Sequence, residues 1–364
     1  MKIGVPKEIK NREYRVGLTP PSVAELTARG HEAIVETGAG SGIDFSDDDY
    51  RAVGATIAPN AAEVFKAADM IVKVKEPQAQ EIALLEPRHI LFTYLHLAAD
   101  KPQAEGLMKS GATCIAYETV TSRSGALPLL KPMSEVAGRM SIQVGAHYLE
   151  KEQGGRGVLL GGVPGVAPAR VAILGGGVAG VNAAQMAVGL RADVTIYDIN
   201  NDRLAELDMF FGSQVKTAYA SKAAIAAAVQ NAALVIGAVL IPGAAAPKLV
   251  TREMLKTMKR GSVLVDIAID QGGCFETSHA TTHDDPVFEV DGVIHYCVAN
   301  MPGAVARTSA FALNNATLPF VVKLADLGAE AAMAADPHLA AGLNVAGGKI
   351  RYVAVAESLG LPLG

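Results

Sequence analysis

Residues 171–180, Val-Ala-Ile-Leu-Gly-Gly-Gly-Val-Ala-Gly, constrain the fold of this chain more than any other stretch. An apolar, β-type run passes directly into three spaced glycines and then into an Ala-rich helical segment. In such a turn Gly175 allows the tight bend, Gly177 lets a pyrophosphate approach the backbone, and Gly180 lets the helix pack on the strand. The helix N-terminus adds free N–H groups and a positive dipole. The pattern predicts a dinucleotide-binding βαβ unit, with a purely structural glycine turn as the alternative.

A second β-type run, residues 193–197, follows a helix-length spacer and ends in Asp198. This is about the twenty-residue distance at which an acidic side chain meets a ribose 2′-hydroxyl. A carboxylate accepts hydrogen bonds from a free 2′-hydroxyl and repels a 2′-phosphate, so Asp198 predicts NAD rather than NADP. Arg203, a basic residue close to Asp198 in the sequence, is the feature that does not fit a preference for NAD over NADP.

The composition fits a well-buried enzyme of two or three domains, because 50% of the 364 residues are hydrophobic and 19% are charged. The net charge is -5 and the sequence has no basic runs, which argues against a basic surface that binds nucleic acid. Three cysteines without Cys-x-x-Cys spacing predict buried thiols rather than disulfides or a zinc site. The histidines show no repeated ligand spacing, so we expect no catalytic metal.

Residues 1–10 carry charges but no apolar core of signal-peptide length, which favours the cytoplasm. Residues 223–247 contain no charge and are long enough to suggest a membrane span. Gln230 and Asn231 in the middle of this segment favour instead an Ala-rich helix, followed by a buried strand at residues 233–240.

Apolar runs of strand length alternate with helical segments along the chain, which predicts an α/β fold with two Rossmann-like, doubly wound parallel-sheet domains. The expected strands of the first part are residues 3–5, 32–36, 69–74, 90–94 and 113–117, and those after Asp198 are residues 234–240, 263–269 and 293–298. The expected helices begin near residue 22 and cover residues 133–153 and 304–326.

The central position of the glycine turn predicts a discontinuous domain plan. Residues 131–304 would form the NAD-binding domain, and residues 1–130 plus 305–364 the substrate domain. The tail after residue 326 is too short for a core of its own, so we expect it to return to the first domain.

Four charged side chains outside the glycine turn are candidates for chemistry, and each has a structural alternative. Arg15 lies in a segment where a solvated loop arginine is the usual case. Lys75 follows a strand, where ligands of open α/β sheets bind, but an exposed strand face shared with Lys73 would explain both lysines. His96 also follows a strand and suits proton transfer near neutral pH, although a loop or core histidine is nearly as common. Asp270 could face a nicotinamide or cap a turn.

Several segments resemble the bacterial L-alanine dehydrogenases of the alanine dehydrogenase and transhydrogenase alpha-subunit family. They occur in the family's order and several are long and ungapped. These segments are IGVPKEIKN (residues 3–11) with Glu13, Arg15, Val16 and residues 18–20, KVKEP (73–77), YLH (94–96), PMSEVAG (132–138), DIAIDQGG (266–273) and HYCVANMP (295–302).

The resemblance implies reversible oxidative deamination of L-alanine with NAD to pyruvate, ammonium and NADH, in two domains separated by a cleft. Arg15 would hold the substrate carboxylate and Lys75 would bind and polarise the carbonyl. His96 would be the acid/base, converging with Lys75 beside the nicotinamide, and Asp270 would position water or ammonia. The family is typically hexameric.

The resemblance also implies a set of residues around NAD. They are Ser134, Gly175, Gly177, Val178, Ala179, Gly180, Asp198, Arg203, Val239, Leu240, Ile267, Asp270, Val298, Asn300 and Met301. One position departs from the family pattern, because Ala220, followed by Ser221, replaces a serine common near the adenosine pocket.

Two other functions stay open at this point. The soluble nucleotide-binding component of a proton-translocating transhydrogenase would share the domain plan, but it would not need Arg15, Lys75 and His96 together. A folded protein that binds NAD without catalysis would not need the acid/base candidates.

Overall fold

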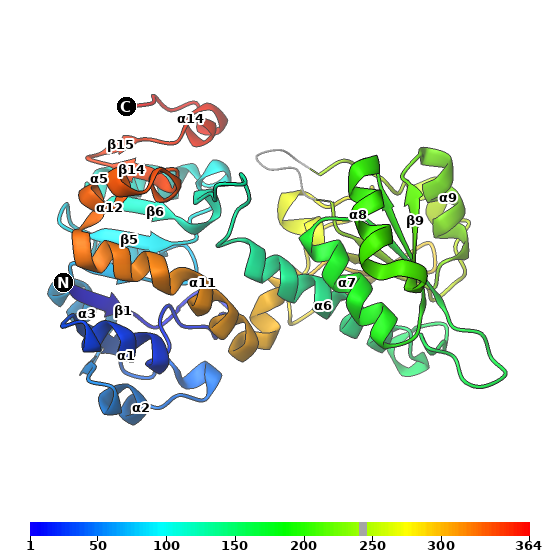
Figure 1. The fold of residues 1–364 in the computed structure, drawn as a ribbon, viewed down its shortest axis with the longest axis horizontal. Coiled ribbons are helices and arrows are strands. Elements are labelled where there is room, and N and C mark those ends of the chain that lie inside the picture. Colours follow the sequence, from blue (N-terminus) through cyan, green and yellow to red (C-terminus); the bar gives the residue numbers. More distant parts are fainter. Residues whose placement is uncertain (240–245) are drawn as a thin grey trace. The chain divides into compact units, whose positions relative to one another are not determined.

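The structure, a computed structural model, describes residues 1–239 and 246–364, and these fold into two units. The first unit contains Met1–Met133 and Val305–Gly364, and the second contains Ser134–Ala304. Each unit has its own mostly parallel sheet with helices packed on it (Figure 1). The predicted α/β class with two Rossmann-like sheets is confirmed.

The sheet of the first unit has the strand order β15-β14-β6-β5-β4-β1-β2-β3. The first six strands of the chain pair in parallel, whereas β14 runs antiparallel to β6 and β15 antiparallel to β14. The tail of the chain therefore completes the first sheet. The strands are β1 (Lys2–Val5), β2 (Glu32–Glu36), β3 (Thr56–Ala58), β4 (Met70–Val72), β5 (Ile90–Thr93), β6 (Thr113–Ala116), β14 (Leu343–Ala346) and β15 (Lys349–Ile350).

The helices of this unit follow ordinary start signals. Asp100, for example, accepts a hydrogen bond from the N–H of Gln103 and caps α5, and Gly111 ends that helix with φ +73°. The helices are α1 (Pro20–Ala28), α2 (Asp47–Ala52), α3 (Ala61–Ala67), α4 (Ala79–Ile82), α5 (Lys101–Ser110), α11 (Ala306–Leu327), α12 (Ala329–Ala335), α13 (Pro337–Ala340) and α14 (Val353–Leu359), with short 3-10 turns η1 (Ser41–Ile43), η2 (Leu97–Ala99) and η3 (Tyr117–Thr119).

The sheet of the second unit has the strand order β12-β13-β11-β10-β7-β8-β9, and every pair except β12 with β13 is parallel. Its strands are β7 (Arg170–Leu174), β8 (Asp193–Asp198), β9 (Val215–Tyr219), β10 (Leu234–Gly237), β11 (Val263–Asp266), β12 (Val287–Val290) and β13 (Val293–Tyr296). Its helices are α6 (Lys131–Tyr148, which begins in the first unit), α7 (Val178–Gly189), α8 (Asn201–Phe211), α9 (Lys222–Asn231) and α10 (Arg252–Leu255), with 3-10 turns η4 (Lys151–Gln153), η5 (Gly212–Gln214), η6 (Ile267–Gln271) and η7 (Met301–Val305, which ends in the first unit).

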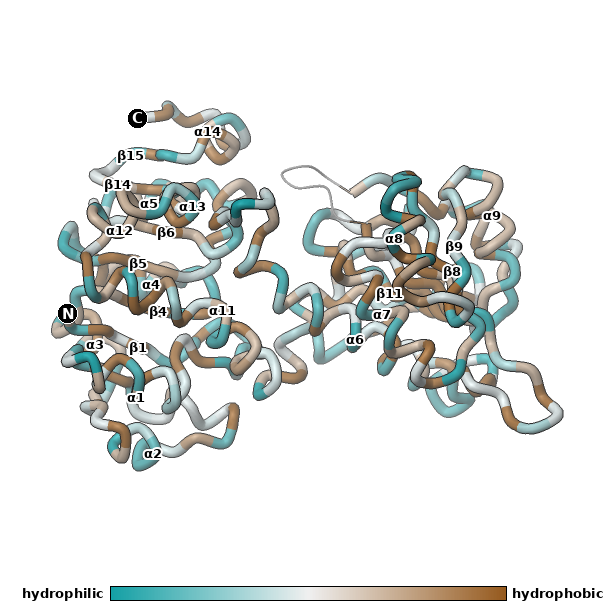
Figure 2. The backbone as a smooth tube through the Cα atoms, in the orientation of Figure 1, coloured by the Kyte–Doolittle hydropathy of each residue, from teal (hydrophilic) through white to brown (hydrophobic). Residues whose placement is uncertain are grey.

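The apolar core of each unit lies along its strands, where the hydrophobic colour concentrates in Figure 2. In the described ranges no helix is long and apolar enough to cross a membrane. The uncharged segment after residue 222 instead contributes α9 and β10 to the second unit. Cys114, Cys274 and Cys297 are buried free thiols, as predicted.

Several predicted strands are longer than the observed ones, three of them by three residues or more. The run 263–269 is wrong in its second half, because the Asp266 carboxylate accepts the N–H of Ala268 and starts a 3-10 turn. The run 233–240 gives a strand only at Leu234–Gly237, and residue 240 lies outside the described residues. The run 69–74 ends as a strand at Val72, so Lys73 and Lys75 both follow the strand.

Candidate active site

The glycine turn connects β7 to α7 and has the geometry that a bound phosphate needs. Gly175 adopts φ +107°, a conformation open to glycine. A Cβ on Gly180 would lie 1.9 Å from the Gly175 carbonyl oxygen, so the helix packs directly on the turn. A Cβ on Gly177, the N-cap residue of α7, would meet no atom of the described residues within 4 Å. No described residue therefore covers Gly177 at the start of this twelve-residue helix, which fits a dinucleotide pyrophosphate.

Asp198 is the last residue of β8 and is bound to the glycine turn. Its Oδ2 accepts the N–H of Gly176 at 2.7 Å, and its Oδ1 accepts the N–H of Asn200 at 2.9 Å. Arg203 reinforces the same turn, because its Nε donates to the Gly176 carbonyl at 2.8 Å while its Nη1 pairs with Glu206. Asp198 and Arg203 thus bind the backbone N–H and the carbonyl of the same residue, Gly176.

The remaining predicted cofactor residues follow the parallel strands of the second sheet. Since β13, β11, β10, β7 and β8 are neighbours, their carboxyl ends meet at one edge, where ligands of open sheets bind. Val239 follows β10, and Leu240 lies outside the described residues. Ile267 and Asp270 follow β11 in η6, Val298, Asn300 and Met301 follow β13, and Val178 and Ala179 begin α7.

Helix α6, which carries Ser134, packs against the first turn of α7. A Cβ on Gly138 would lie 2.2 Å from the carbonyl oxygen of Ala179. The glycine at position 138 is therefore what allows this close approach. Ala220 and Ser221 lie after β9, where the hydroxyl of Ser221 caps α9 by accepting the N–H of Ala224.

Asp270 is exposed, and the turn that carries it is fixed by the buried Asp266. The Asp266 carboxylate accepts the Ser278 hydroxyl at 2.5 Å and the N–H of Cys274 at 2.9 Å, besides starting η6. Burial raises the pKa of Asp266, while these hydrogen bonds lower it. Asp266 lies inside a matched motif, but its role as the anchor of η6 was missed in the sequence.

Arg15 is 2% exposed, so a solvated loop arginine is the wrong explanation for it. Its Nε and Nη2 donate to the two oxygens of Glu13 at 2.7 and 2.6 Å, and its Nη1 approaches the Sδ of Met133 at 2.9 Å. Burial lowers the pKa of Arg15, but the Glu13 carboxylate raises it above its ordinary value, so the guanidinium stays charged. A buried cation held in a fixed plane suits a substrate carboxylate.

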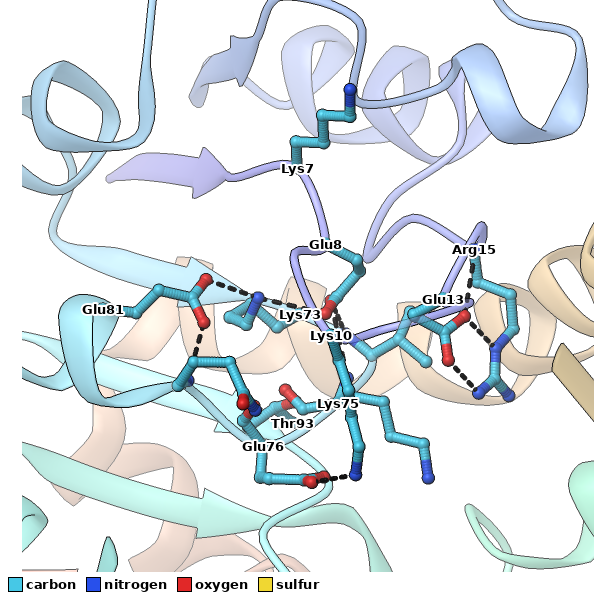
Figure 3. A network of polar contacts seen from close by, with 12 residues as sticks. Lys7, Glu8, Lys10, Glu13, Arg15, Lys73, Lys75, Glu76, Glu81 and Thr93 are labelled. Atoms are coloured by element: carbon cyan, nitrogen blue, oxygen red, sulfur yellow. Dashed lines mark hydrogen bonds and ion pairs between the residues drawn. The ribbon is translucent and has the colours of Figure 1, made fainter. Parts of the chain in front are cut away.

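Lys73 and Lys75 differ in environment, although they are two residues apart. Lys73 is fully buried, and its Nζ pairs with Glu8 at 3.1 Å and Glu81 at 2.7 Å, so the exposed-face explanation is wrong for Lys73. Lys75 is half-buried, and Figure 3 shows its side chain pointing away from these two carboxylates. Of the two lysines, Lys75 is the one that can reach a ligand.

His96 is exposed and has positive φ, +51°. Its backbone N–H donates to Glu118 Oε1 at 2.6 Å, and its ring stacks on Tyr94 with centroids 5.7 Å apart. Tyr94 is itself fixed, because its hydroxyl donates to the Leu129 carbonyl at 2.6 Å. Glu118 therefore fixes the backbone of His96, and Tyr94 supports one face of an imidazole that stays exposed.

The three candidate segments of the first unit leave the sheet at neighbouring strands. Strand β4 lies between β1 and β5, and all three run in parallel. Arg15 belongs to the loop after β1, Lys75 follows β4, and His96 follows β5. The sequence missed Glu8, Glu13, Glu81 and Glu118, which hold these segments, since a solvent-exposed acid has the same local pattern.

Comparisons with known proteins cover the whole chain. The model described as alanine dehydrogenase/PNT, N-terminal domain, matches residues 4–137, and the one for the C-terminal domain matches residues 141–353. The alanine dehydrogenase of Halomonas elongata is 62% identical over 361 residues, 99% of this chain and 97% of that protein.

Solved structures give the same result. An L-alanine dehydrogenase superposes with a TM-score of 0.96 at 54% identity, covering 99% of each chain. A transhydrogenase from Sinorhizobium meliloti is a more distant likeness, with a TM-score of 0.85 at 28% identity over 96% of this chain and all of that one. The family and the Rossmann-like fold imply a nicotinamide dinucleotide cofactor and small-molecule substrates. The chain therefore belongs to the alanine dehydrogenase/PNT family, as the sequence predicted, and it is an amino-acid dehydrogenase.

Proposed function

We propose that this protein catalyses the reversible oxidative deamination of L-alanine with NAD to pyruvate, ammonium and NADH. The observation that carries the proposal is the similarity to proteins named alanine dehydrogenase, which extends over both units. The buried, charged Arg15 supports it, because a small amino acid needs one firm contact for its carboxylate.

The proposed cofactor is NAD. When bound, it accepts a hydride from the substrate carbon. The turn at Gly175, Gly177 and Gly180 would hold its pyrophosphate, and Asp198 would accept the ribose hydroxyls. The other residues proposed around it are Ser134, Val178, Ala179, Arg203, Val239, Leu240, Ile267, Asp270, Val298, Asn300 and Met301.

In the proposed substrate site, Arg15 pairs with the carboxylate of alanine or pyruvate. Glu13 already occupies the Nε and Nη2 edge of the guanidinium, so it fixes the plane in which the substrate carboxylate must lie. Lys75 places a positive charge at the carbonyl oxygen of pyruvate and polarises that bond.

Proton transfer is assigned to His96 and Asp270. Once the amino group of alanine has released a proton to solvent, loss of a hydride from the alanine carbon leaves an iminium, and His96 takes a proton from the water that attacks it. The resulting carbinolamine expels ammonia when His96 returns this proton to nitrogen, while the hydroxyl proton leaves and the carbonyl forms. Asp270 would position the water or ammonia and relay protons to solvent, which suits its exposed place in η6.

A direct assay tests this proposal. The purified protein should form NADH from NAD and L-alanine, and should consume NADH with pyruvate and ammonium. Hydride exchange between two nicotinamide nucleotides without any dependence on alanine would favour the transhydrogenase alternative.

We also propose that the protein works in the cytoplasm as a homo-oligomer, a hexamer as is typical of the family. Light scattering of the purified protein would measure its mass in solution against the 37.7 kDa chain.

A further inference from the structure

Glu8 lies in the loop after β1 and is buried, with a side chain that is 2% exposed. Its Oε1 accepts the N–H of Val74 at 2.6 Å and, in a longer bond, the N–H of Lys75 at 3.4 Å. Both amides belong to the segment that follows β4. A carboxylate from one loop therefore replaces the strand that would otherwise satisfy these N–H groups.

The opposite side of the same segment is held by β5. The N–H of Lys73 donates to the Phe92 carbonyl at 3.2 Å, and the Val74 carbonyl accepts the N–H of Tyr94 at 3.3 Å. The Thr93 hydroxyl donates to the Lys75 carbonyl at 2.9 Å. The backbone of residues 73–75 is thus clamped between Glu8 and β5.

The position of Glu8 depends on a buried cation. Glu8 Oε2 pairs with Lys73, which also pairs with Glu81 (Figure 3). Glu81 is fixed in turn, because its other oxygen accepts the N–H of Gln78 at 2.8 Å and caps α4. Breaking a buried pair is costly, so this triad holds the Glu8 carboxylate in one place.

We propose that Glu8 is a positioning residue, which holds the backbone of Lys75 so that the Lys75 ammonium meets the substrate carbonyl. This inference rests on the proposed function, in which Lys75 binds pyruvate. Lys73 and Glu81 have a separate task, because they hold Glu8 and make no contact with substrate in this scheme.

The test distinguishes the effect of losing the hydrogen-bond acceptor at residue 8 from the effect of changing the buried charges. In the neutral background Lys73→Met/Glu81→Gln, we compare Glu8→Gln, which keeps an oxygen for the two amides, with Glu8→Leu, which does not. Replacing a buried ion network with neutral groups of similar size is often tolerated. The readouts are the KM for pyruvate, kcat and the NADH dissociation constant from fluorescence.

We expect the KM for pyruvate to be roughly tenfold higher for Glu8→Leu than for Glu8→Gln, the size of effect expected when buried amides lose an acceptor. The NADH dissociation constant should be the same in both. Equal KM values in the two variants would overturn the proposal, even if Glu8→Leu also melted at a lower temperature. The exposed Glu86, which pairs with Arg88, provides the matched control Glu86→Gln, for which no change is expected.

If the neutral background does not fold, the single variant Glu8→Asp tests the positioning role instead. It keeps the charge but draws the oxygens back from the amides, so the KM for pyruvate should rise, and an unchanged KM would overturn the inference. The two proposals fail differently. If the wild-type protein does not form NADH from alanine, the proposed function is refuted. If the wild type is active but the Glu8 variants do not differ in their KM for pyruvate, only the positioning role is refuted.

Discussion

The hydroxyl of Thr93 donates a hydrogen bond of 2.9 Å to the carbonyl oxygen of Lys75. Thr93 is the last residue of β5 and is fully buried, so this bond joins the ends of two neighbouring parallel strands. His96 follows three residues later, on the same strand end. The two side chains that we propose for substrate polarisation and proton transfer are therefore attached to one rigid edge.

His96→Ala should lower turnover by about 10²- to 10⁴-fold, the usual cost of removing a general acid/base. Binding of NADH should persist, because we assign it to the glycine turn and Asp198 in the other unit. Steady-state kinetics and NADH fluorescence measure the two effects. Near-normal turnover would remove His96 from the mechanism, and loss of NADH binding would indicate a folding defect instead.

Lys75→Ala should both raise the KM for pyruvate and lower kcat, because it removes the positive charge that we propose at the carbonyl. We expect kcat/KM for pyruvate to fall by roughly 10- to 100-fold, the effect of losing a hydrogen bond to a charged group. Lys7→Ala is the control, since Lys7 is an exposed lysine of the same unit. Equal kinetics for the two variants would contradict the assignment of Lys75.

Asp198→Ala should reduce the preference for NAD over NADP by roughly 10- to 100-fold, measured as the ratio of kcat/KM values for the two cofactors. The carboxylate is fixed in one orientation by the N–H groups of Gly176 and Asn200, and we propose that it accepts the ribose hydroxyls in this orientation. Asp202→Ala, at an exposed position in the next helix, is the control. An unchanged cofactor ratio would show that another residue sets the preference.

Gly177→Ala should fold normally yet bind NADH at least about tenfold more weakly. The added methyl group meets no atom of the described residues within 4 Å, so it occupies the space that we assign to the pyrophosphate. Gly189→Ala, at the other end of the same helix, also meets no atom within 4 Å in the part of the chain that the structure describes, and it should bind NADH normally. Gly180→Ala should instead lower the melting temperature, because its Cβ would lie 1.9 Å from the Gly175 carbonyl oxygen.

His295 should make the second unit less stable in mild acid. Burial lowers the pKa of His295 to about 4, below the value of about 6.5 for a free imidazole. Between these values the unfolded chain binds a proton that the folded chain does not, so the free energy of unfolding falls as the pH falls from about 7 to about 4. Its ring nitrogens lie 2.8 Å from Thr277 Oγ1 and 3.0 Å from the Val293 carbonyl, a pattern that suits the neutral ring.

Urea unfolding at pH 7 and pH 5 tests this dependence. The loss of stability between the two pH values should be smaller in His295→Gln than in the wild type. His147→Gln, at an exposed histidine of the same unit, should lose as much as the wild type. Identical losses in all three proteins would show that His295 does not titrate on unfolding.

Local patterns predicted most of the fold. The glycine turn and the apolar runs depend on neighbouring residues, and β2, β8 and α7 lie where these patterns put them. The run after Val265 misled the prediction because Ile267 and Ile269 have strand-like character, whereas the Asp266 carboxylate and Gly272, with φ +87°, close a 3-10 turn there.

The polar contacts of the first unit could not be predicted in the same way. Glu8 meets Lys73 across 65 residues of sequence, and His96 meets Glu118 across 22. Alternation along a strand predicts the face on which a side chain lies, but not whether a distant loop covers that face. Lys73 is buried because the Glu8 loop covers it, and this contact has no local signal.

The antiparallel pairing of β14 with β6 sets an order of events during synthesis of the chain on the ribosome. Ala116 ends β6, and Leu343 begins β14, so the entire second unit is translated between the two partners. At about 5–20 residues per second, the outer edge of β6 waits roughly 10 to 50 s for its neighbour. An open edge strand readily pairs with other chains, so the nascent protein is most prone to aggregation in this interval.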